Sequence, residues 1–149
     1  MPLEGEYAPS PSQWVRDQVD LYESSGGTEG LTLMNTGLPV VVVVNRGVKT
    51  GKIRKTPLMR VEHDGVYLAV GSKGGAPEDP LWVNNLRANP QVEVWDGQTR
   101  VDRVAREVSG EERATWWERA VAAFPPYAEY GEKTQRLIPV FVLEPAPAR

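Results

Sequence analysis

Cysteine is absent from the 149-residue sequence, and histidine occurs only once, as His63. Without cysteine the chain can form no disulfide, thiolate nucleophile, iron–sulfur cluster or cysteine-ligated zinc site. A metal site would need carboxylates for nearly all of its ligands, and no group of carboxylates has a recognisable metal-binding spacing. His63 would be the base of any Ser-His-Asp triad, but the surrounding His-Asp-Gly indicates a turn. We therefore expect neither a metal site nor a histidine-based triad.

Long hydrophobic segments are also absent. The N-terminal residues contain two early glutamates and no apolar stretch typical of a secretory signal. The longest apolar run, Leu38 to Val44, is far shorter than the ~20 residues that a membrane helix needs. We therefore expect a cytoplasmic protein. The N-terminal arm lacks the apolar and basic character of a membrane anchor, and only Trp14 leaves room for peripheral membrane contact with a lipophilic substrate.

Positive charge is concentrated in one segment of an otherwise acidic chain. Residues 46–60 contain six basic residues and no acidic one, although the net charge of the chain is -3. The rest of the chain carries 11 Lys plus Arg against 20 Asp plus Glu. This distribution favours a local anion site over a nucleic-acid-binding surface, and the glycines of the segment allow backbone N–H groups to approach an anion. The alternative is a charged hairpin that only keeps the protein soluble.

The basic segment contains no standard nucleotide-binding motif. It lacks the spacing of a Walker loop, and it leads into a strand instead of a helix. Where it becomes a strand, Arg54 and Thr56 should share one face, and Lys55 should point away from it. Pro57 cannot donate a hydrogen bond to a neighbouring strand, which indicates an edge strand or a bulge.

Turn residues and apolar patterns predict six strands and three helices in one mainly β (α+β) chain. The predicted strands are residues 39–45, 56–62, 66–72, 91–95, 100–108 and 138–143. The predicted helices are 12–24, 81–88 and 109–124, capped by Ser12, Asp79 and Ser109 with Glu112. Adjacent hairpins favour an antiparallel sheet, closed into a small, partly open barrel with helices at its ends. The run of five valines from Val40 to Val44 predicts a strand buried on both faces.

The expected domain organisation is an N-terminal arm and helix at 1–29, followed by a barrel domain at 30–149. Residues 1–11 contain three prolines and should form a loose arm. Residues 125–136, PPYAEYGEKTQR, should form a loop or a broken helix. The helix that follows Asp79-Pro80 should direct its positive dipole end towards the anion site.

Several motifs together resemble one family. These are RGVKTGKIRKTPLMRVEHDG at 46–65, VGSKGGAPEDPLWVNNLRANPQVEV at 70–94, AAFPPYAEY at 122–130 and IPVFVLEP at 138–145. The sequence resembles the deazaflavin-dependent nitroreductases, which use coenzyme F420, an 8-hydroxy-5-deazaflavin. The resemblance extends from about Gly30 to Pro145. It implies a split β-barrel related to the FMN-binding barrels.

The resemblance also implies which residues bind the cofactor. They are Val48, Lys49, Thr50, Arg54, Lys55, Thr56, Pro57, Leu58, Met59, Val70, Gly71, Ser72, Lys73, Leu81, Trp82, Val83, Asn84, Asn85 and Tyr127. Met59 and Phe124 depart from the residues common at their positions, and both positions should face the substrate pocket. The cofactor carries a phosphodiester and a tail of several glutamates, so a basic loop is its physical complement.

The implied activity is hydride transfer from reduced F420 to an electrophilic acceptor such as a quinone, a nitroaromatic compound or an enone. Tyr127, Tyr130 and Ser72 could donate a hydrogen bond or a proton to the anion that develops on the acceptor. For the two tyrosines the alternative is simple packing. The whole chain could instead be an FMN- or haem-binding barrel, or a non-enzymatic deazaflavin carrier, and nucleic-acid binding is a third alternative. A monomer and a homodimer both remain open.

Overall fold

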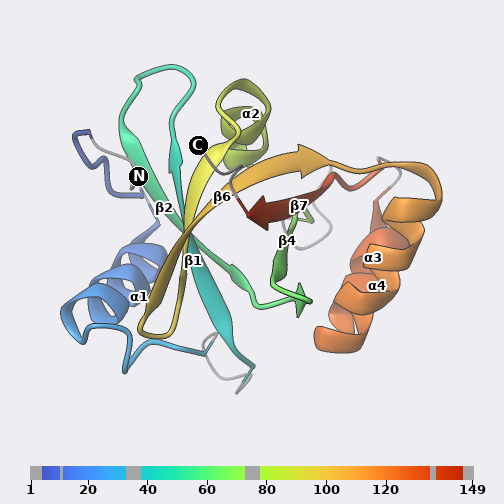
Figure 1. The fold of residues 1–149 in the computed structure, drawn as a ribbon, viewed down its shortest axis with the longest axis horizontal. Coiled ribbons are helices and arrows are strands. Elements are labelled where there is room, and N and C mark those ends of the chain that lie inside the picture. The colour runs from blue at the N-terminus through green and yellow to red at the C-terminus, as the bar shows by residue number, and fades with distance from the viewer. Residues whose placement is uncertain (1–4, 11, 33–37, 73–77, 135–136, 146–149) are drawn as a thin grey trace.

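The computed structural model describes residues 5–10, 12–32, 38–72, 78–134 and 137–145. In this part of the chain, seven antiparallel strands form one curled sheet in the order β2-β1-β5-β6-β7-β4-β3 (Figure 1). The strands are β1 (Val40–Arg46), β2 (Ile53–Met59), β3 (Glu62–His63), β4 (Val66–Val70), β5 (Gln91–Asp96), β6 (Thr99–Glu107) and β7 (Val140–Pro145). The helices are α1 (Gln13–Ser24), α2 (Leu81–Ala88), α3 (Gly110–Ala123) and α4 (Pro126–Lys133). The predicted antiparallel, split-barrel architecture is confirmed.

Strand β1 is buried on both faces, as the valine run predicts. Each of its five valines is at most 4% exposed. Side chains alternate across a strand, so Val40, Val42 and Val44 join one apolar cluster while Val41 and Val43 join another. Residues of α1, α3 and α4 complete the first cluster, and residues of α2 complete the second. The valine run therefore lies between α2 on one face and α1, α3 and α4 on the other.

The segment 53–63 forms two strands where the sequence predicts one. The Arg60 N–H donates to the Pro39 oxygen at 2.9 Å, beyond the end of β1, whereas the Val61 oxygen accepts from the Leu68 N–H at 2.9 Å. The chain thus leaves one neighbouring strand and joins another between these two residues. This change of partner gives seven strands in place of the expected six. Pro57 lies in β2, at one edge of the sheet, as predicted.

Ser12 and Ser109 are the N-cap residues that the sequence predicts, without side-chain capping bonds, but the cap at Asp79 and the capping box with Glu112 are wrong, and both carboxylates have arginine partners. The N-cap of α2 is Pro80, not Asp79, and it forms no side-chain capping bond; the Asp79 carboxylate lies 3.9 Å from Arg87. Ser109 is the N-cap of α3, also without a side-chain bond. Glu112 accepts from both terminal nitrogens of Arg106 at 2.8 Å. Charge pairing across the surface replaces the expected local capping.

The segment predicted as a loop or broken helix contains the regular helix α4. Proline at its start is compatible with the first turn of a helix, where an N–H has no intrahelical partner. As a result Tyr127 and Tyr130 lie on one helix, and their ring centroids are 6.2 Å apart. None of the helices in the described ranges is both long and apolar enough to cross a membrane.

The described part of the N-terminal arm is attached to the sheet, so the prediction of a loose arm is wrong for residues 5–10. The Ala8 N–H donates to the Ile53 oxygen at 2.9 Å, and the Ile53 N–H donates to the Glu6 oxygen at 2.7 Å. The arm therefore continues the sheet beyond its edge strand, because β2 offers unpaired backbone groups there. The division into residues 1–29 and 30–149 stays a prediction.

Candidate functional site

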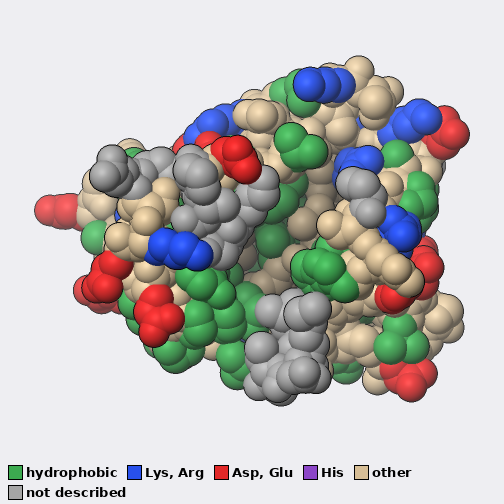
Figure 2. Space-filling model, turned by 180° about the vertical axis from the view of Figure 1, so that it is seen from behind, with side chains coloured by type: hydrophobic (Ala, Val, Ile, Leu, Met, Phe, Trp, Pro, Cys, Tyr) green, Lys and Arg blue, Asp and Glu red, His purple; other side chains and the backbone are tan. Residues whose placement is uncertain are grey.

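A cavity of about 470 Å³ lies between the N-terminal segment, β2, α2 and the junction of α3 with α4. This volume is within the range of small-molecule and cofactor sites. On the face shown in Figure 2, hydrophobic side chains border a hollow in the surface. The cavity is lined by Ser10, Ser12, Trp14, Val15, Arg54, Lys55, Thr56, Pro57, Leu58, Met59, Val70, Ser72, Pro80, Leu81, Trp82, Asn85, Phe124, Tyr127 and Tyr130.

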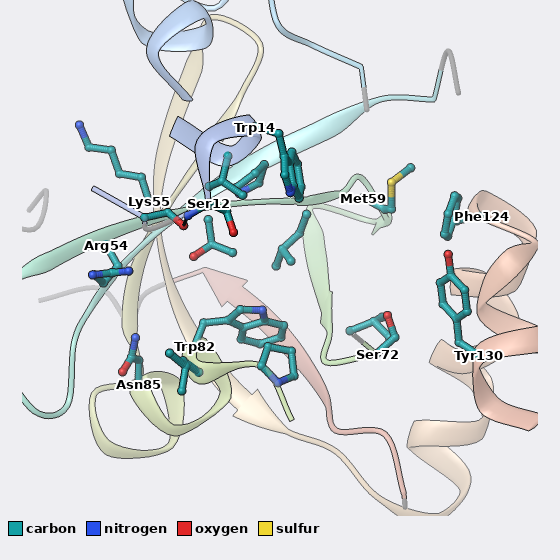
Figure 3. Close-up of a pocket in the computed structure, with 18 of the residues that line it drawn as sticks. Ser12, Trp14, Arg54, Lys55, Met59, Ser72, Trp82, Asn85, Phe124 and Tyr130 are labelled. Atoms are coloured by element: carbon teal, nitrogen blue, oxygen red, sulfur yellow. Dashed lines mark hydrogen bonds between the residues drawn. The ribbon is translucent and has the colours of Figure 1, made fainter. Parts of the chain in front are cut away.

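The cavity has a polar end and an aromatic end. Arg54 and Asn85 lie at one end, close to the β1–β2 hairpin (Figure 3). Met59, Phe124 and Tyr130 lie at the other end (Figure 3). A ligand that spans the cavity would therefore place an anionic part and an apolar or aromatic part in different surroundings.

At least three of the six basic residues at 46–60 are paired with acidic residues of the described segments. Lys52 lies 3.7 Å from Glu6, and Lys55 lies 2.8 Å from Glu23. Each of these acidic residues is in the N-terminal segment. The concentration of positive charge seen in the sequence is therefore partly neutralised in three dimensions.

Arg60 forms the third pair, with Asp96, and this pairing explains why the pKa of Asp96 is lowered. It donates from Nε to both carboxylate oxygens of Asp96 at 3.0 and 3.1 Å, and the Tyr67 hydroxyl donates to the same carboxylate at 2.7 Å. Burial alone would raise the pKa of Asp96, but these hydrogen bonds and the charge of Arg60 lower it. The pair ties β5 to the end of β2 and does not line the cavity.

Arg54 is the basic residue that remains available inside the cavity. It is partly buried, and its guanidinium forms no hydrogen bond or ion pair with the described residues. Both Arg54 and Lys55 line the cavity, but their side chains extend in different directions in Figure 3. A partly desolvated guanidinium without a carboxylate partner is well suited to bind an anionic ligand.

Two buried asparagines connect three segments around the polar end. Asn45 is 0% exposed, and its Nδ2 donates to the Val43 oxygen at 3.1 Å and to Thr56 Oγ1 at 3.3 Å. Its Oδ1 accepts from Asn85 Nδ2 at 2.9 Å. Asn85 Oδ1 in turn accepts from the Val48 N–H at 3.0 Å. The network joins β2, α2 and the β1–β2 hairpin, and two of its members line the cavity.

The aromatic end is a cluster of rings from the junction of α3 with α4. The centroids of Phe124 and Tyr127 are 4.9 Å apart, with the rings at 77°, and Phe124 and Tyr130 are 6.1 Å apart. Tyr127 is 4% exposed, and its hydroxyl forms no hydrogen bond with the described residues. Burial, followed by the neighbouring Tyr130, raises the pKa of Tyr127. This phenol therefore remains protonated at neutral pH and can donate a hydrogen bond to a ligand.

Many of the predicted site residues meet at this cavity. They are Arg54, Lys55, Thr56, Pro57, Leu58, Met59, Val70, Ser72, Leu81, Trp82, Asn85, Tyr127 and Tyr130. The predicted hairpin residues, Val48 to Thr50, are exposed and lie outside the lining, and Asn84 is also exposed. Lys73 lies outside the described residues.

Gly71 and Val83, which were also predicted to bind the cofactor, contact each other instead. A Cβ on Gly71 would lie 2.9 Å from Val83 Cγ2. Glycine therefore allows α2 to pack closely against the chain after β4. Both residues support the cavity wall without lining it.

The lining residues of the N-terminal segment and Pro80 were not predicted from the sequence. Ser10, Ser12, Trp14 and Val15 reach the cavity because residues 6–8 pair with β2. The available signal was Trp14, a large apolar side chain two residues after the predicted N-cap Ser12. The pairing of the arm with the edge strand β2 uses backbone groups, so no sequence pattern indicates it.

The profile of the F420H(2)-dependent quinone reductase family matches residues 14–145. The chain belongs to this family. It is 36% identical over 134 residues to the F420H(2)-dependent quinone reductase Rv1261c of Mycobacterium tuberculosis, a match covering 88% of this chain and 89% of the relative. Membership confirms the predicted class, an oxidoreductase that depends on coenzyme F420.

Two solved structures are more similar in sequence. An F420-H2 dependent reductase is 56% identical, with a TM-score of 0.68 over 71% of this chain and 94% of that chain. A protein described as a domain-swapped dimer is 51% identical, with a TM-score of 0.71 over 91% of this chain and 100% of that chain. Both similarities support the split-barrel fold for this chain.

Proposed function

We propose that this protein binds reduced coenzyme F420 in the cavity and catalyses hydride transfer to a quinone. Nitroaromatic compounds and enones are further acceptors of the same electrophilic class. The observation that carries the proposal is the arrangement of the cavity, with the unpaired Arg54 at one end and an aromatic cluster at the other. Family membership supports the choice of cofactor and acceptor.

The described residues fit such a cofactor. Its phosphodiester and glutamate tail need cations and N–H donors, and the guanidinium of Arg54 can bind two anionic oxygens at once. Lys49 lies in the hairpin that Asn85 holds through the Val48 N–H. Helix α2 begins at Leu81 on the cavity wall, so the positive end of its dipole favours a nearby anion. Met59, Val70 and Trp82 provide apolar surface for the ring.

When bound, the cofactor supplies the hydride at its C5. The side chains of this protein orient the reactants, exclude water and stabilise the charge that forms on the acceptor. We propose Tyr127 as the hydrogen-bond donor to the acceptor oxygen, because its neutral hydroxyl has no partner among the described residues. Tyr130 and Ser72 line the same cavity and can assist as further hydroxyl donors.

Removal of these hydroxyls should slow turnover without loss of cofactor. Tyr127→Phe is expected to lower kcat for quinone reduction about ten-fold, since one hydrogen bond to the developing anion is lost. Tyr127→Phe combined with Tyr130→Phe should lower it further. Steady-state kinetics with reduced F420 measure the effect, and the dissociation constant for oxidised F420 serves as the control. Unchanged turnover in the double variant would show that neither phenol acts as a donor.

The function itself is tested by titration followed by turnover. Oxidised F420 should bind with quenching of deazaflavin fluorescence, and the reduced form should be oxidised when a quinone is added. Binding without oxidation across quinones, nitroaromatics and enones would identify a non-enzymatic carrier instead.

The alternatives with another cofactor predict different spectra. A yellow preparation would identify an FMN protein, and a Soret band would identify a haem protein. The cavity lining contains no imidazole to ligate haem iron among its described residues, since the single histidine, His63, lies in β3 with its side chain 48% exposed. This observation favours the deazaflavin.

The assembly state is either a monomer or a homodimer, and light scattering distinguishes them. The 51% identical structure described as a domain-swapped dimer favours the homodimer. We propose a cytoplasmic location and small-molecule partners, not nucleic acid. Trp14, which is 43% exposed at the cavity rim, is the residue available for peripheral membrane contact with a lipophilic acceptor.

A further inference from the structure

The ammonium group of Lys55 is surrounded by partners from outside β2. Its Nζ donates to the two carboxylate oxygens of Glu23 in α1 at 2.8 and 3.0 Å. The same nitrogen lies 4.2 Å from the ring centroid of Tyr7 in the arm and 5.0 Å from that of Trp95 in β5. The Lys55 side chain is only 12% exposed. Its stem borders the cavity, but its charge is directed towards the N-terminal segment.

The N-terminal segment contributes a wall of the cavity, formed by Ser10, Ser12, Trp14 and Val15. We name these four residues the N-terminal wall. Arg16 stabilises the wall from within, because its Nη1 donates to the Ser10 oxygen at 2.8 Å. Trp14 and Trp82 face the cavity from opposite sides in Figure 3.

Lys55 connects the N-terminal wall with β2 at both of the wall's ends. Tyr7 precedes the wall and Glu23 follows it, and the ammonium of Lys55 contacts both. The backbone bonds between Ile53 and residues 6 and 8 lie two residues away from Lys55 on the same strand. Lys55 is therefore a side chain that holds both ends of the wall to β2.

We propose that Lys55 is a positioning residue, which holds the N-terminal wall through Tyr7 and Glu23 and thereby sets the affinity for the hydride acceptor. The inference rests on the proposed function. All the residues proposed to bind the cofactor come from the barrel segments 48–85, whereas Tyr127 of α4 is proposed to contact the acceptor. The N-terminal wall, together with the Tyr127 side of the cavity, is thus left for the acceptor.

Direct binding of the cofactor tail by Lys55 is the competing reading. It would require the ammonium to leave Glu23 and two aromatic rings, whereas its neighbour Arg54 has no such partner in the part of the chain that the structure describes. Partly buried charge pairs and cation–π contacts stabilise a lysine in one position. The geometry therefore favours Arg54 for the anion and Lys55 for the wall.

Two variants separate the readings. Lys55→Met should raise KM for a water-soluble naphthoquinone about five-fold and change the dissociation constant for oxidised F420 less than two-fold. Glu23→Gln should have the same effect, since it breaks the same pair from the other side. Direct binding predicts the opposite for Glu23→Gln, because the released Lys55 would then bind the anionic tail more tightly.

A matched control and a rescue complete the experiment. Lys52→Met removes a positive charge from the same hairpin, and its 3.7 Å pair with Glu6 is exposed at 44% and 75%, so little change is expected. The exchanged pair, Lys55→Glu with Glu23→Lys, should restore KM for the quinone. Higher cofactor dissociation constants in Lys55→Met, with an unchanged KM for the quinone, would overturn the proposal.

Hydrogen exchange tests the structural part without any cofactor. In Lys55→Met, exchange at the Ala8 and Ile53 amides should be about ten-fold faster than in the unmodified protein, because the arm separates from β2 more often. Unchanged exchange at both amides would show that Lys55 does not hold the arm. This readout separates a failure of the positioning role from a failure of F420 binding, which the titration of the unmodified protein detects.

Discussion

Arg54→Met is expected to weaken the binding of oxidised F420 about 100-fold, which corresponds to roughly 2.7 kcal/mol. The guanidinium lines the polar end of the cavity and has no partner among the described residues, so its charge is available for the anionic tail. For the same reason its removal should leave the free energy of unfolding nearly unchanged. Fluorescence titration measures the dissociation constant, and urea unfolding checks the fold.

Two further arginine variants sharpen this prediction. Arg54→Lys keeps the charge but loses the planar, two-pronged donor, and it should recover only part of the affinity. Arg106→Met is the control, because Arg106 is exposed and bound to Glu112 and Glu144 at 2.8 Å outside the cavity lining. If Arg54→Met binds F420 as tightly as the control does, the anion is held elsewhere.

Gly27→Ala is expected to lower the free energy of unfolding by about 3 kcal/mol or more. Gly27 follows α1 with a φ of +85°, and a Cβ there would lie 1.9 Å from the backbone oxygen of Gly97. The backbones at Gly27 and Gly97 cannot easily move apart, because hydrogen bonds hold both segments in place. The Gly27 N–H donates to the Tyr22 oxygen at 2.9 Å, and the Tyr22 hydroxyl donates to the Trp95 oxygen at 2.9 Å.

The adjacent glycine is a matched control for this variant. Gly26 has a φ of +67°, but nothing lies within 4 Å of an added Cβ. Gly26→Ala therefore adds only the strain of a left-handed backbone, about 1 kcal/mol. Urea unfolding of the two variants isolates the cost of the close approach. Equal losses would mean that the contact with Gly97 contributes little to the docking of α1.

The sequence predicts the elements of the barrel better than it predicts their partners. The continuous valine run places β1 well, and apolar alternation and turn glycines place the hairpins well, because these signals are local. The predictions of caps at Asp79 and Glu112 fail because both carboxylates pair with arginines. Which arginine lies beside each carboxylate depends on the tertiary fold. The prediction of a loose arm fails for a related reason. The arm pairs with β2 through backbone groups, which all residues have in common.

The same limit applies to the candidate site. The six basic residues at 46–60 form one charged group in the sequence, but Lys55 pairs with Glu23, which lies 32 residues away. Sequence spacing could not show that Arg54 would remain unpaired beside it. A resemblance to known enzymes indicated most of the lining, since motif positions carry over with the barrel. It gave nothing for the N-terminal wall.

The pair formed by Asn45 and Asn85 has a consequence for evolution and for engineering. A hairpin transplanted from another barrel would meet α2 correctly only if position 85 still offered an acceptor to the Val48 N–H. Likewise, a change at Asn45 reaches the strand, the helix and the loop together, because its carboxamide touches both Thr56 and Asn85. Strand β2, helix α2 and the β1–β2 hairpin therefore have to be conserved, or redesigned, together.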